Sequence, residues 1–170
     1  WQGLGHAGVL ETLSDGGWRY RDPDDGSVWI FDRLDRATAR TSRNGWRQVF
    51  TYDASGRISA VTNAFGRRLD FIYEAGGMNP SEVRTPGGGV VRYSWNGPAG
   101  LLGSVEQADG SRRRYWYEDP RHPLALTAIE DESGIRYASF GYDAEGRAIA
   151  SEHAGGVLRY QVAQRSDAVT

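Results

Sequence analysis

The sequence predicts an all-β fold, an array of antiparallel β-hairpin repeats that forms a curved or spiralling sheet. An aromatic residue followed by an acidic or amide residue recurs six times, with steps of 21, 21, 22, 22 and 25 residues. Glycines recur in phase with these pairs, and 23 glycines against one methionine favour a turn-dense β protein. A period of this length indicates a repeat architecture, in which one unit cannot bury its apolar face alone. The pairs are Phe31-Asp32, Tyr52-Asp53, Tyr73-Glu74, Trp95-Asn96, Tyr117-Glu118 and Tyr142-Asp143, and the glycines are Gly26, Gly45, Gly66, Gly88, Gly110, Gly134 and Gly155.

Taken in order, the chain divides into three segments. Residues 1–17 are predicted to be an N-terminal lead-in, because the pattern is weak before Gly26. Residues 18–163 are predicted to be a repeat segment of about six hairpin units, followed by a frayed tail over residues 164–170. Residues 33–43 are the one place where the sequence predicts a helical turn.

The first strand of each repeat is aromatic on one face. In an extended segment, Arg67, Leu69, Phe71 and Tyr73 point to the same side of the sheet. Lined up side by side, such strands form a cross-strand ladder in which each ring pair contributes about 0.5 to 1 kcal/mol beyond burial. The same register groups Ser27, Trp29 and Phe31; Trp46, Gln48, Phe50 and Tyr52; Val91, Tyr93 and Trp95; and Arg113, Tyr115 and Tyr117.

The second strand of each repeat is shorter and less aromatic. These strands are predicted over residues 57–62, 81–85, 102–107, 126–131 and 148–152, with a last strand over residues 157–163. They end in turn dipeptides such as Asp109-Gly110, where glycine supplies the positive φ of a tight turn. After the aromatic strand, an acidic side chain such as Asp53 can cap the backbone NH groups of its own turn. The repeating acid is therefore interpreted as a turn residue rather than a catalyst.

Six units of two strands give about 12 strands, and a sheet that wide must coil because every strand pair adds twist. One unit is longer and carries Pro120 and Pro123, which predict a wide loop. In the same unit Tyr142 falls one residue out of phase, so a bulge at Phe140-Gly141 is expected to restore its face.

Composition excludes several classes of protein. A formal charge of -2 gives no net field that would recruit nucleic acid or an anionic membrane. Cysteine is absent, so disulfides and thiolate-bound metals are excluded. No apolar run approaches the roughly 18 residues of a membrane span. Because the sequence begins at Trp1 without a charged leader or signal peptide, it is expected to be an internal piece of a larger protein.

The chain shows no recognisable catalytic, metal or cofactor site. His6, His122 and His153 lie far apart in predicted loops, without the spacing of a metal site. No nucleophile occupies a recognisable elbow. The remaining candidate clusters are interpreted as turns or alternating strand residues, not as a calcium loop, a glycosidase pair or a phosphate-binding patch. These clusters are Asp22, Asp24 and Asp25; Glu130, Asp131 and Glu132; and Arg112, Arg113 and Arg114.

The repeat unit resembles the YD repeat of Rhs (rearrangement hotspot) proteins. The resemblance rests on residues 52–58, Tyr-Asp-Ala-Ser-Gly-Arg-Ile, and on residues 142–148, Tyr-Asp-Ala-Glu-Gly-Arg-Ala. The glycine turns over residues 63–67 and 109–112 resemble those of the same repeat, and residues 117–127 and 151–156 resemble the middle of a proteobacterial Rhs core. The resemblance covers about residues 18 to 160, although Phe31-Asp32, Tyr73-Glu74 and Trp95-Asn96 spell the motif loosely.

This resemblance implies a segment of a β-cocoon shell, related to the shells of toxin complexes and teneurins. Such a shell encloses a C-terminal toxin domain of a bacterial polymorphic toxin, delivered for example by type VI secretion. The implied partners are the remaining Rhs core and the enclosed toxin of the same polypeptide, with secretion spike proteins and a chaperone as further candidates. The implied localisation is secretion or delivery to a target cell after synthesis in the bacterial cytoplasm. The self-cleavage motif of the family is absent from this sequence, so no residue inherits that role.

Three functional hypotheses follow. The first is a non-enzymatic structural segment of an Rhs-type shell, with no cofactor, no nucleic acid and no membrane contact. The second is a carbohydrate-binding module that stacks cell-surface sugars on the aromatic face, around Tyr115. The third is a glycosidase built from the repeated carboxylates.

Overall fold

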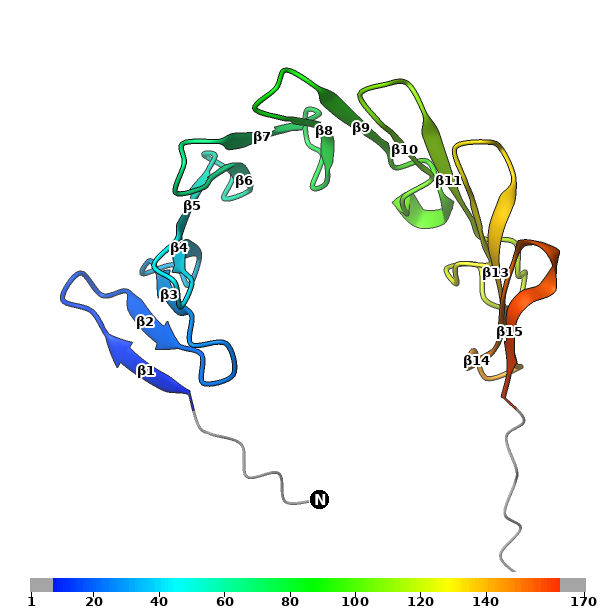
Figure 1. The fold of residues 1–170 in the computed structure, drawn as a ribbon, viewed down its shortest axis with the longest axis horizontal. Coiled ribbons are helices and arrows are strands. Elements are labelled where there is room, and N and C mark those ends of the chain that lie inside the picture. Colours follow the sequence, from blue (N-terminus) through cyan, green and yellow to red (C-terminus); the bar gives the residue numbers. More distant parts are fainter. Residues whose placement is uncertain (1–7, 163–170) are drawn as a thin grey trace, which may run out of the picture. The chain divides into compact units, whose positions relative to one another are not determined.

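The computed structural model describes residues 8–162 and is all-β, which confirms the predicted fold class. Fifteen strands follow one another in an open antiparallel sheet in chain order, where the repeat count predicted about 12. Two short 3-10 turns, η1 (Pro98–Gly100) and η2 (Ala154–Gly156), interrupt the strands (Figure 1). No helical segment in this part of the chain is long and apolar enough to cross a membrane. The strands are β1 (Val9–Thr12), β2 (Trp18–Arg21), β3 (Val28–Phe31), β4 (Ala37–Thr41), β5 (Arg47–Tyr52), β6 (Ile58–Thr62), β7 (Arg68–Tyr73), β8 (Pro80–Arg84), β9 (Val90–Ser94), β10 (Ser104–Glu106), β11 (Arg112–Trp116), β12 (Ala128–Glu130), β13 (Arg136–Tyr142), β14 (Ala148–His153) and β15 (Val157–Gln161).

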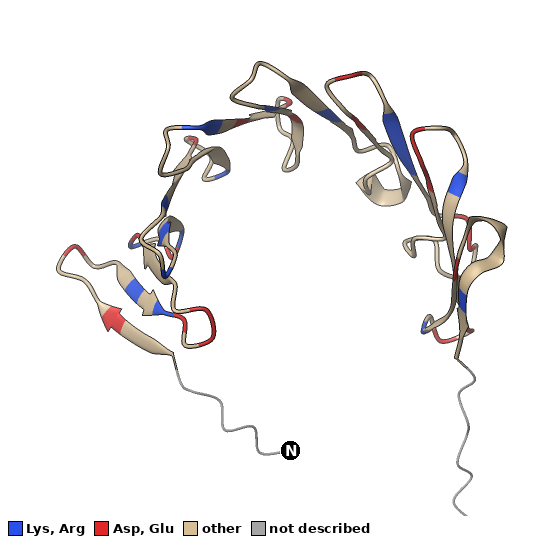
Figure 2. Cartoon of the chain, in the orientation of Figure 1, with Lys and Arg blue, Asp and Glu red and all other residues tan. Residues whose placement is uncertain are grey.

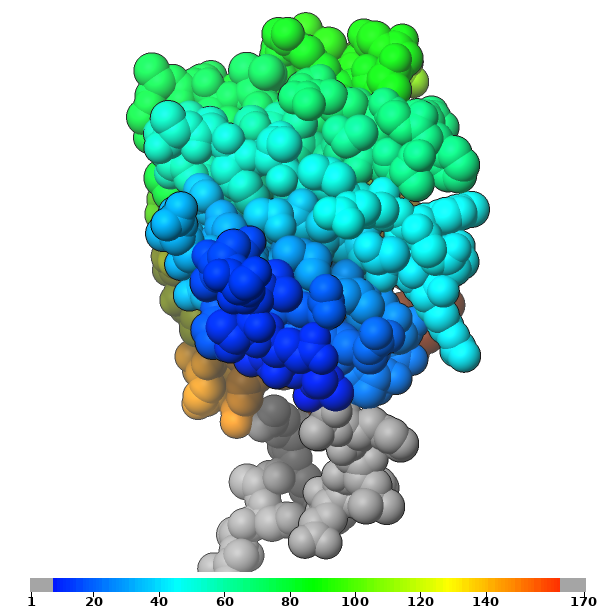
Figure 3. Space-filling view, turned by 90° about the vertical axis from the view of Figure 1, so that its left-hand side faces the viewer, coloured from blue at the N-terminus to red at the C-terminus, as the bar shows by residue number. Residues whose placement is uncertain are grey.

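The sheet divides into two compact units. Unit 1 contains the described residues up to Met78 together with Val83–Gly89, and so includes β1 to β7. Unit 2 contains Asn79–Glu82 and the described residues from Val90 onward, and so includes β9 to β15. Figure 3 shows the strands of unit 1 as successive bands from blue to green.

The tight turns repeat one geometry. At the end of β5, the Asp53 backbone NH donates to the Arg57 carbonyl at 2.8 Å, and the Gly56 NH donates to the Asp53 carbonyl at 3.0 Å. Gly56 has a φ of 80°, a conformation that β-carbon sterics make costly for other residues. Gly45, one of the periodic glycines of the sequence, closes its turn in the same way, because its NH donates to the Ser42 carbonyl at 2.9 Å and its φ is 85°.

The predicted aromatic face is present in both units. In unit 1 the register places Trp29 opposite Arg40 and Arg40 opposite Gln48, so residues two positions apart continue the same face. The rings of Trp29 and Phe50 stack with centroids 6.1 Å apart. In unit 2 the rings of Tyr93 and Trp95 stack at 6.4 Å. The Trp29 and Phe50 rings therefore stack across strands, as the ladder predicts, whereas Tyr93 and Trp95 stack along one segment.

The buried positions of both units hold small side chains. Ala39 and Ala60 are 1% and 0% exposed, and Ala39 aligns with Ile30 and Val49 on the face opposite the aromatic one. Among the described residues, the largest side chain below 2% exposure is that of Ser27. Contacts within the sheet, rather than a thick apolar core, therefore hold each hairpin to the next.

Residues 33–43 are not a helical turn, so that prediction is wrong. Alanine and arginine both favour helices, but Ala37–Thr41 forms strand β4 between β3 and β5. The neighbouring strands β3 and β5 pair with this segment on both sides, and Ala39 is buried between them. Strand β1 also lies within the predicted lead-in, while the predicted tail over residues 164–170 lies outside the described residues.

Register irregularities occur where the aromatic strands end. The register shifts at the boundary of Gly141 and Tyr142, close to the bulge predicted at Phe140-Gly141. The same shift occurs between Thr51 and Tyr52 in unit 1. A bulge changes the face of the sheet to which the following side chain points. Here the shift immediately precedes Tyr52 and Tyr142, the last aromatic residues of their strands.

Candidate functional site

The aromatic-acid pairs lie at the ends of the aromatic strands. In unit 1, β3, β5 and β7 end at Phe31, Tyr52 and Tyr73, and each acid follows directly. Because antiparallel strands reverse at every turn, these alternate turns share one edge of the unit, which we call the pair edge. The turns at the other edge, such as those over residues 42–46 and 63–67, form the opposite edge.

The aromatic residue of each pair ties its strand to the strand before it. The Tyr52 hydroxyl donates to the Ala37 carbonyl at 2.7 Å, and the Tyr73 hydroxyl donates to the Ile58 carbonyl at 2.8 Å. Ala37 and Ile58 are the first residues of β4 and β6. Unit 2 repeats this with Trp95 Nε1 to the Pro80 carbonyl (2.8 Å), the Tyr117 hydroxyl to the Leu102 carbonyl (3.0 Å) and the Tyr142 hydroxyl to the Leu126 carbonyl (2.7 Å).

These hydroxyls are donors rather than catalytic bases. Burial raises the pKa of Tyr52, Tyr73 and Tyr117 above the usual tyrosine value, because an apolar environment disfavours the phenolate. Each phenol therefore stays protonated near neutral pH and can donate to its carbonyl. Phe31 has no hydroxyl, so the first pair lacks this bond.

The acid of the pair caps its own turn, as the sequence predicts. Asp53 Oδ1 accepts the backbone NH groups of Ser55 and Arg57, both at 2.9 Å, and Oδ2 accepts Arg57 Nε at 2.8 Å. The hydrogen bonds from Arg57 and then Ser55 lower the pKa of Asp53 despite an opposing effect of burial. Asp32 and Asp143 bind Arg36 and Arg147 in the same way, and their pKa values are also lowered. A carboxylate that is this well satisfied is a poor proton donor.

The arginine four residues after the acid reaches the next repeat. Arg57 lies over the ring of Tyr73 at 4.3 Å, and Arg36 lies over the ring of Tyr52 at 4.7 Å. Such contacts contribute about 0.5 to 1 kcal/mol at exposed sites. An acid, an arginine and the next tyrosine thus form a continuous link between repeats. Sequence reasoning missed the arginine, although an arginine follows Asp32, Asp53 and Asp143 at the same spacing of four residues.

Three pairs depart from this arrangement. Glu74, Asn96 and Glu118 are followed four residues later by Met78, Gly100 and His122, so none of them has an arginine partner of this kind. Tyr73-Glu74 and Trp95-Asn96 are also two of the pairs that match the sequence motif only loosely.

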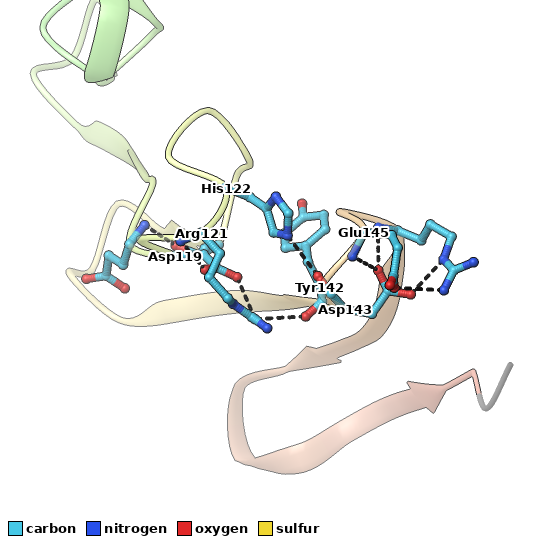
Figure 4. Close-up of polar contacts among 9 residues, drawn as sticks. Asp119, Arg121, His122, Tyr142, Asp143 and Glu145 are labelled. Atoms are coloured by element: carbon cyan, nitrogen blue, oxygen red, sulfur yellow. Dashed lines mark hydrogen bonds and ion pairs between the residues drawn. The ribbon is translucent and has the colours of Figure 1, made fainter.

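The histidines serve packing and loop contacts. His122 Nε2 lies 2.8 Å from the Asp143 carbonyl oxygen, and Arg121 Nη2 donates to the Tyr142 carbonyl at 3.1 Å (Figure 4). The predicted wide loop is thus bound to the next aromatic-acid pair. The ring of His153 packs on Tyr137 at 4.7 Å, and His6 lies outside the described residues. Within residues 8–162, no cluster of three or more His, Cys, Asp or Glu side chains could hold a metal ion.

The acidic and basic clusters are divided among turns and ion pairs. Asp22 and Asp25 accept backbone NH groups of their own turn, and Asp131 does the same for Ser133 and Ile135. The three successive arginines have three separate partners: Arg112 pairs with Glu106, Arg113 with Glu132 and Arg114 with Glu130. In Figure 2 many of the acids lie in turns, whereas the three successive arginines lie on strand β11.

Comparison with known proteins supports the fold and the repeat. Residues 31–68 match the family model described as RHS Repeat. The chain is similar to a crystal structure of TcdB2-TccC3-Cdc42, with a TM-score of 0.52, 14% identity and coverage of 80% of this chain. It is also similar to a Photorhabdus luminescens Tc holotoxin pore with a TccC3 mutation, with a TM-score of 0.53, 15% identity and 86% coverage. It spans 7% and 9% of those chains. No curated protein matches the sequence.

Proposed function

We propose that the chain, in which residues 31–68 match the RHS Repeat family model, is a non-enzymatic structural segment of an RHS-type shell. In this proposal the shell encloses a C-terminal toxin domain of the same polypeptide for secretion and delivery to a target cell. Its partners are the rest of the shell and the enclosed toxin, with secretion spike proteins and a chaperone as further candidates. The similarity to chains of Tc toxin assemblies supports the proposal at the level of fold.

The observation that carries the proposal is the repeated link between one hairpin and the next. Asp53, Arg57 and Tyr73 have the polar groups that chemistry would need, yet each is bound to a neighbouring repeat or to its own turn. The complete link occurs at two successive hairpins of unit 1, and its hydrogen bond from the aromatic residue recurs in unit 2. In this proposal, such repeated contacts between neighbouring hairpins support a continuous wall. A catalytic site would instead concentrate poised groups in one place.

The experiment is a deletion in a longer RHS protein that contains this segment. Removing residues 90–112 takes out β9 and β10 and shifts every later strand by one hairpin. We expect the enclosed domain of the purified protein to become sensitive to protease. Asp53→Asn is the matched control, because an amide oxygen can still cap the turn, as Asn63 does for Phe65 and Arg67.

An unexpected result in the deletion and an unexpected result in the point variants would contradict different parts of the proposal. Full protease protection after the deletion would contradict the role as a wall. Loss of toxin activity in Asp53→Asn, or in Glu118→Gln, with protection intact would instead indicate chemistry at that carboxylate. The carbohydrate-binding alternative has its own test, since specific glycan binding lost in Tyr115→Ala with the fold retained would replace the structural proposal.

A further inference from the structure

The link between repeats lacks its cation at one tyrosine of unit 2. In the complete link, Arg57 follows the acid by four residues and lies over the Tyr73 ring at 4.3 Å. The corresponding residue after Asn96 is Gly100, and no arginine in residues 8–162 makes a cation–π contact with Tyr117. The Tyr117 hydroxyl still makes the hydrogen bond of the link. Tyr117 therefore keeps one contact of the link without the guanidinium.

The two other incomplete links of the chain differ from this one. Arg121 of the wide loop reaches the next pair, because its Nη2 donates to the Tyr142 carbonyl at 3.1 Å. The ring of Trp95 stacks on that of Tyr93 at 6.4 Å. Among the described residues, no other ring stacks on Tyr117. Tyr117 is thus the tyrosine at which neither a cation nor a second ring takes the place of the arginine.

A hollow of about 290 Å³ lies at Tyr117, and Asn96, Gly97 and Gly103 contribute to its wall. The two glycines allow the backbone to approach closely. A β-carbon at Gly97 would lie 2.8 Å from the Leu101 carbonyl oxygen and 3.2 Å from Tyr117 Cε2. A β-carbon at Gly103 would collide with Asn96 Oδ1. Both glycines are therefore needed to bring the Asn96 amide and the Tyr117 ring to the same hollow.

The unengaged groups of the hollow are suited to a cation. The Asn96 side chain forms no hydrogen bond with the described residues, so its amide oxygen is an unused acceptor. The Tyr117 ring has a negative face, which attracts cations. Burial and then the neighbouring Tyr115 raise the pKa of Tyr117, whereas at Tyr73 the charge of Arg57 opposes the effect of burial. The surroundings of the Tyr117 ring are therefore not already balanced by a cation.

The charged residues of the hollow have partners of opposite sign. Arg114 lines the hollow and pairs with Glu130, while Glu118 also lines it and accepts Arg136 Nη2 at 2.6 Å. The wall therefore offers no unpaired charge to either an anion or a cation. A guanidinium is planar, stacks on aromatic rings and is more weakly hydrated than an ammonium. It is thus the cation that suits a hollow whose recognition groups are a ring and an amide.

We infer that the hollow at Tyr117 binds a guanidinium group, supplied by an arginine side chain of another polypeptide segment. The guanidinium would stack on the Tyr117 ring and donate to Asn96 Oδ1. These are the two kinds of contact that Arg57 makes with Tyr73 and Asp53 in unit 1. The inference concerns one site of unit 2 and does not depend on the proposed wall.

The test uses the 170-residue chain and N-acetylarginine methylamide as the probe. Titration is followed by the ring carbon–proton NMR signals of Tyr117, assigned with Tyr117→Phe. We expect weak, saturable binding that shifts these signals. N-acetylcitrulline methylamide has a neutral side chain of nearly the same shape and should bind about tenfold more weakly, because the attraction to the ring requires the charge. The corresponding lysine derivative should also bind more weakly, because its ammonium is more strongly hydrated.

Substitutions that create binding avoid the ambiguity of a variant that fails to fold. Asn96→Asp should tighten binding about tenfold, because a carboxylate replaces the amide acceptor. Asn63→Asp is the matched control, since Asn63 already caps its own turn, and it should leave binding unchanged. In the wild type the Tyr73 signals should not respond to the probe. In Arg57→Ala they should respond, because the guanidinium that covers this ring is removed.

Four results would overturn the inference. These are no shift of the Tyr117 signals at any soluble concentration of the probe, equal binding of the citrulline derivative, equal binding of the lysine derivative, and unchanged or weaker binding in Asn96→Asp. The source of the arginine has its own test, in which the chain alone is diluted. Tyr117 shifts that depend on the concentration of the chain would support the site with a second copy as the source. Probe binding with signals independent of that concentration would support it with a different polypeptide as the source.

Discussion

Tyr73 has two separable contacts, since its ring packs under Arg57 and its hydroxyl donates to the Ile58 carbonyl. Tyr73→Phe removes only the hydroxyl, and Phe31 already occupies the corresponding position of an earlier repeat. We expect a loss of about 1 kcal/mol in the free energy of unfolding, because a partly buried carbonyl loses its donor. Denaturant titration measures this loss. Tyr160→Phe is the control at a tyrosine that is 65% exposed, and an equal effect there would exclude a specific role for the Tyr73 hydroxyl.

The capping aspartates make stability depend on acid pH. The pKa values of Asp32, Asp53 and Asp143 are lowered in the folded chain, whereas in the unfolded chain they return to about 3.9. Their contribution is therefore complete above about pH 4 and is lost as pH falls through the lowered folded-state values. We expect the melting temperature to be level from about pH 7 to pH 5 and to fall below about pH 4. Asp53→Asn should flatten part of this fall, and a melting temperature independent of pH down to about pH 2 would contradict the assignment.

Turn glycines set the geometry of the hairpin as an element. Gly110 has a φ of 86°, and a β-carbon built there would meet nothing within 4 Å. Gly110→Val therefore tests backbone strain without a steric clash. We expect it to lower the free energy of unfolding by about 1 to 3 kcal/mol. His122→Ala removes one side-chain contact to a backbone oxygen and should cost less. Thermal melts show which of the two variants is less stable. A larger drop in melting temperature for His122→Ala than for Gly110→Val would contradict this prediction.

A comparison of predicted and observed strands and turns shows which of them could be predicted from the sequence. Alternation and turn glycines placed the strand predicted over residues 148–152, which is β14 (Ala148–His153), and identified the acid of the pair as a cap. The prediction failed at β4, where local helix propensity competed with pairing partners supplied from outside the segment. It also missed the contact between the Trp46 and Phe65 rings, because the two turns that carry them come together only when the strands between them pair.

At the scale of the whole molecule, packing joins strands that are consecutive in the chain. Strand pairs such as β4 with β5 and β13 with β14 account for the contacts between elements within each unit. The tyrosine hydroxyls add hydrogen bonds between strands that are already neighbours, and Arg36 and Arg57 each reach the tyrosine of the next repeat. Stability should therefore behave as a sum of hairpin terms and nearest-neighbour terms, as in other repeat proteins.

Nearest-neighbour stability predicts a graded hydrogen-exchange pattern within unit 1. Amides of β5 should exchange more slowly than those of β1, because β5 has a strand on both sides and β1 pairs with β2 alone among the described strands. Tyr73→Phe should accelerate exchange in β6 and β7, which its hydroxyl joins, and leave β2 nearly unchanged. Mass-spectrometric hydrogen exchange on the wild type and this variant measures both effects. Uniform acceleration across β2 to β7 would show that the unit opens as one cooperative block, and would exclude the additive description of the array.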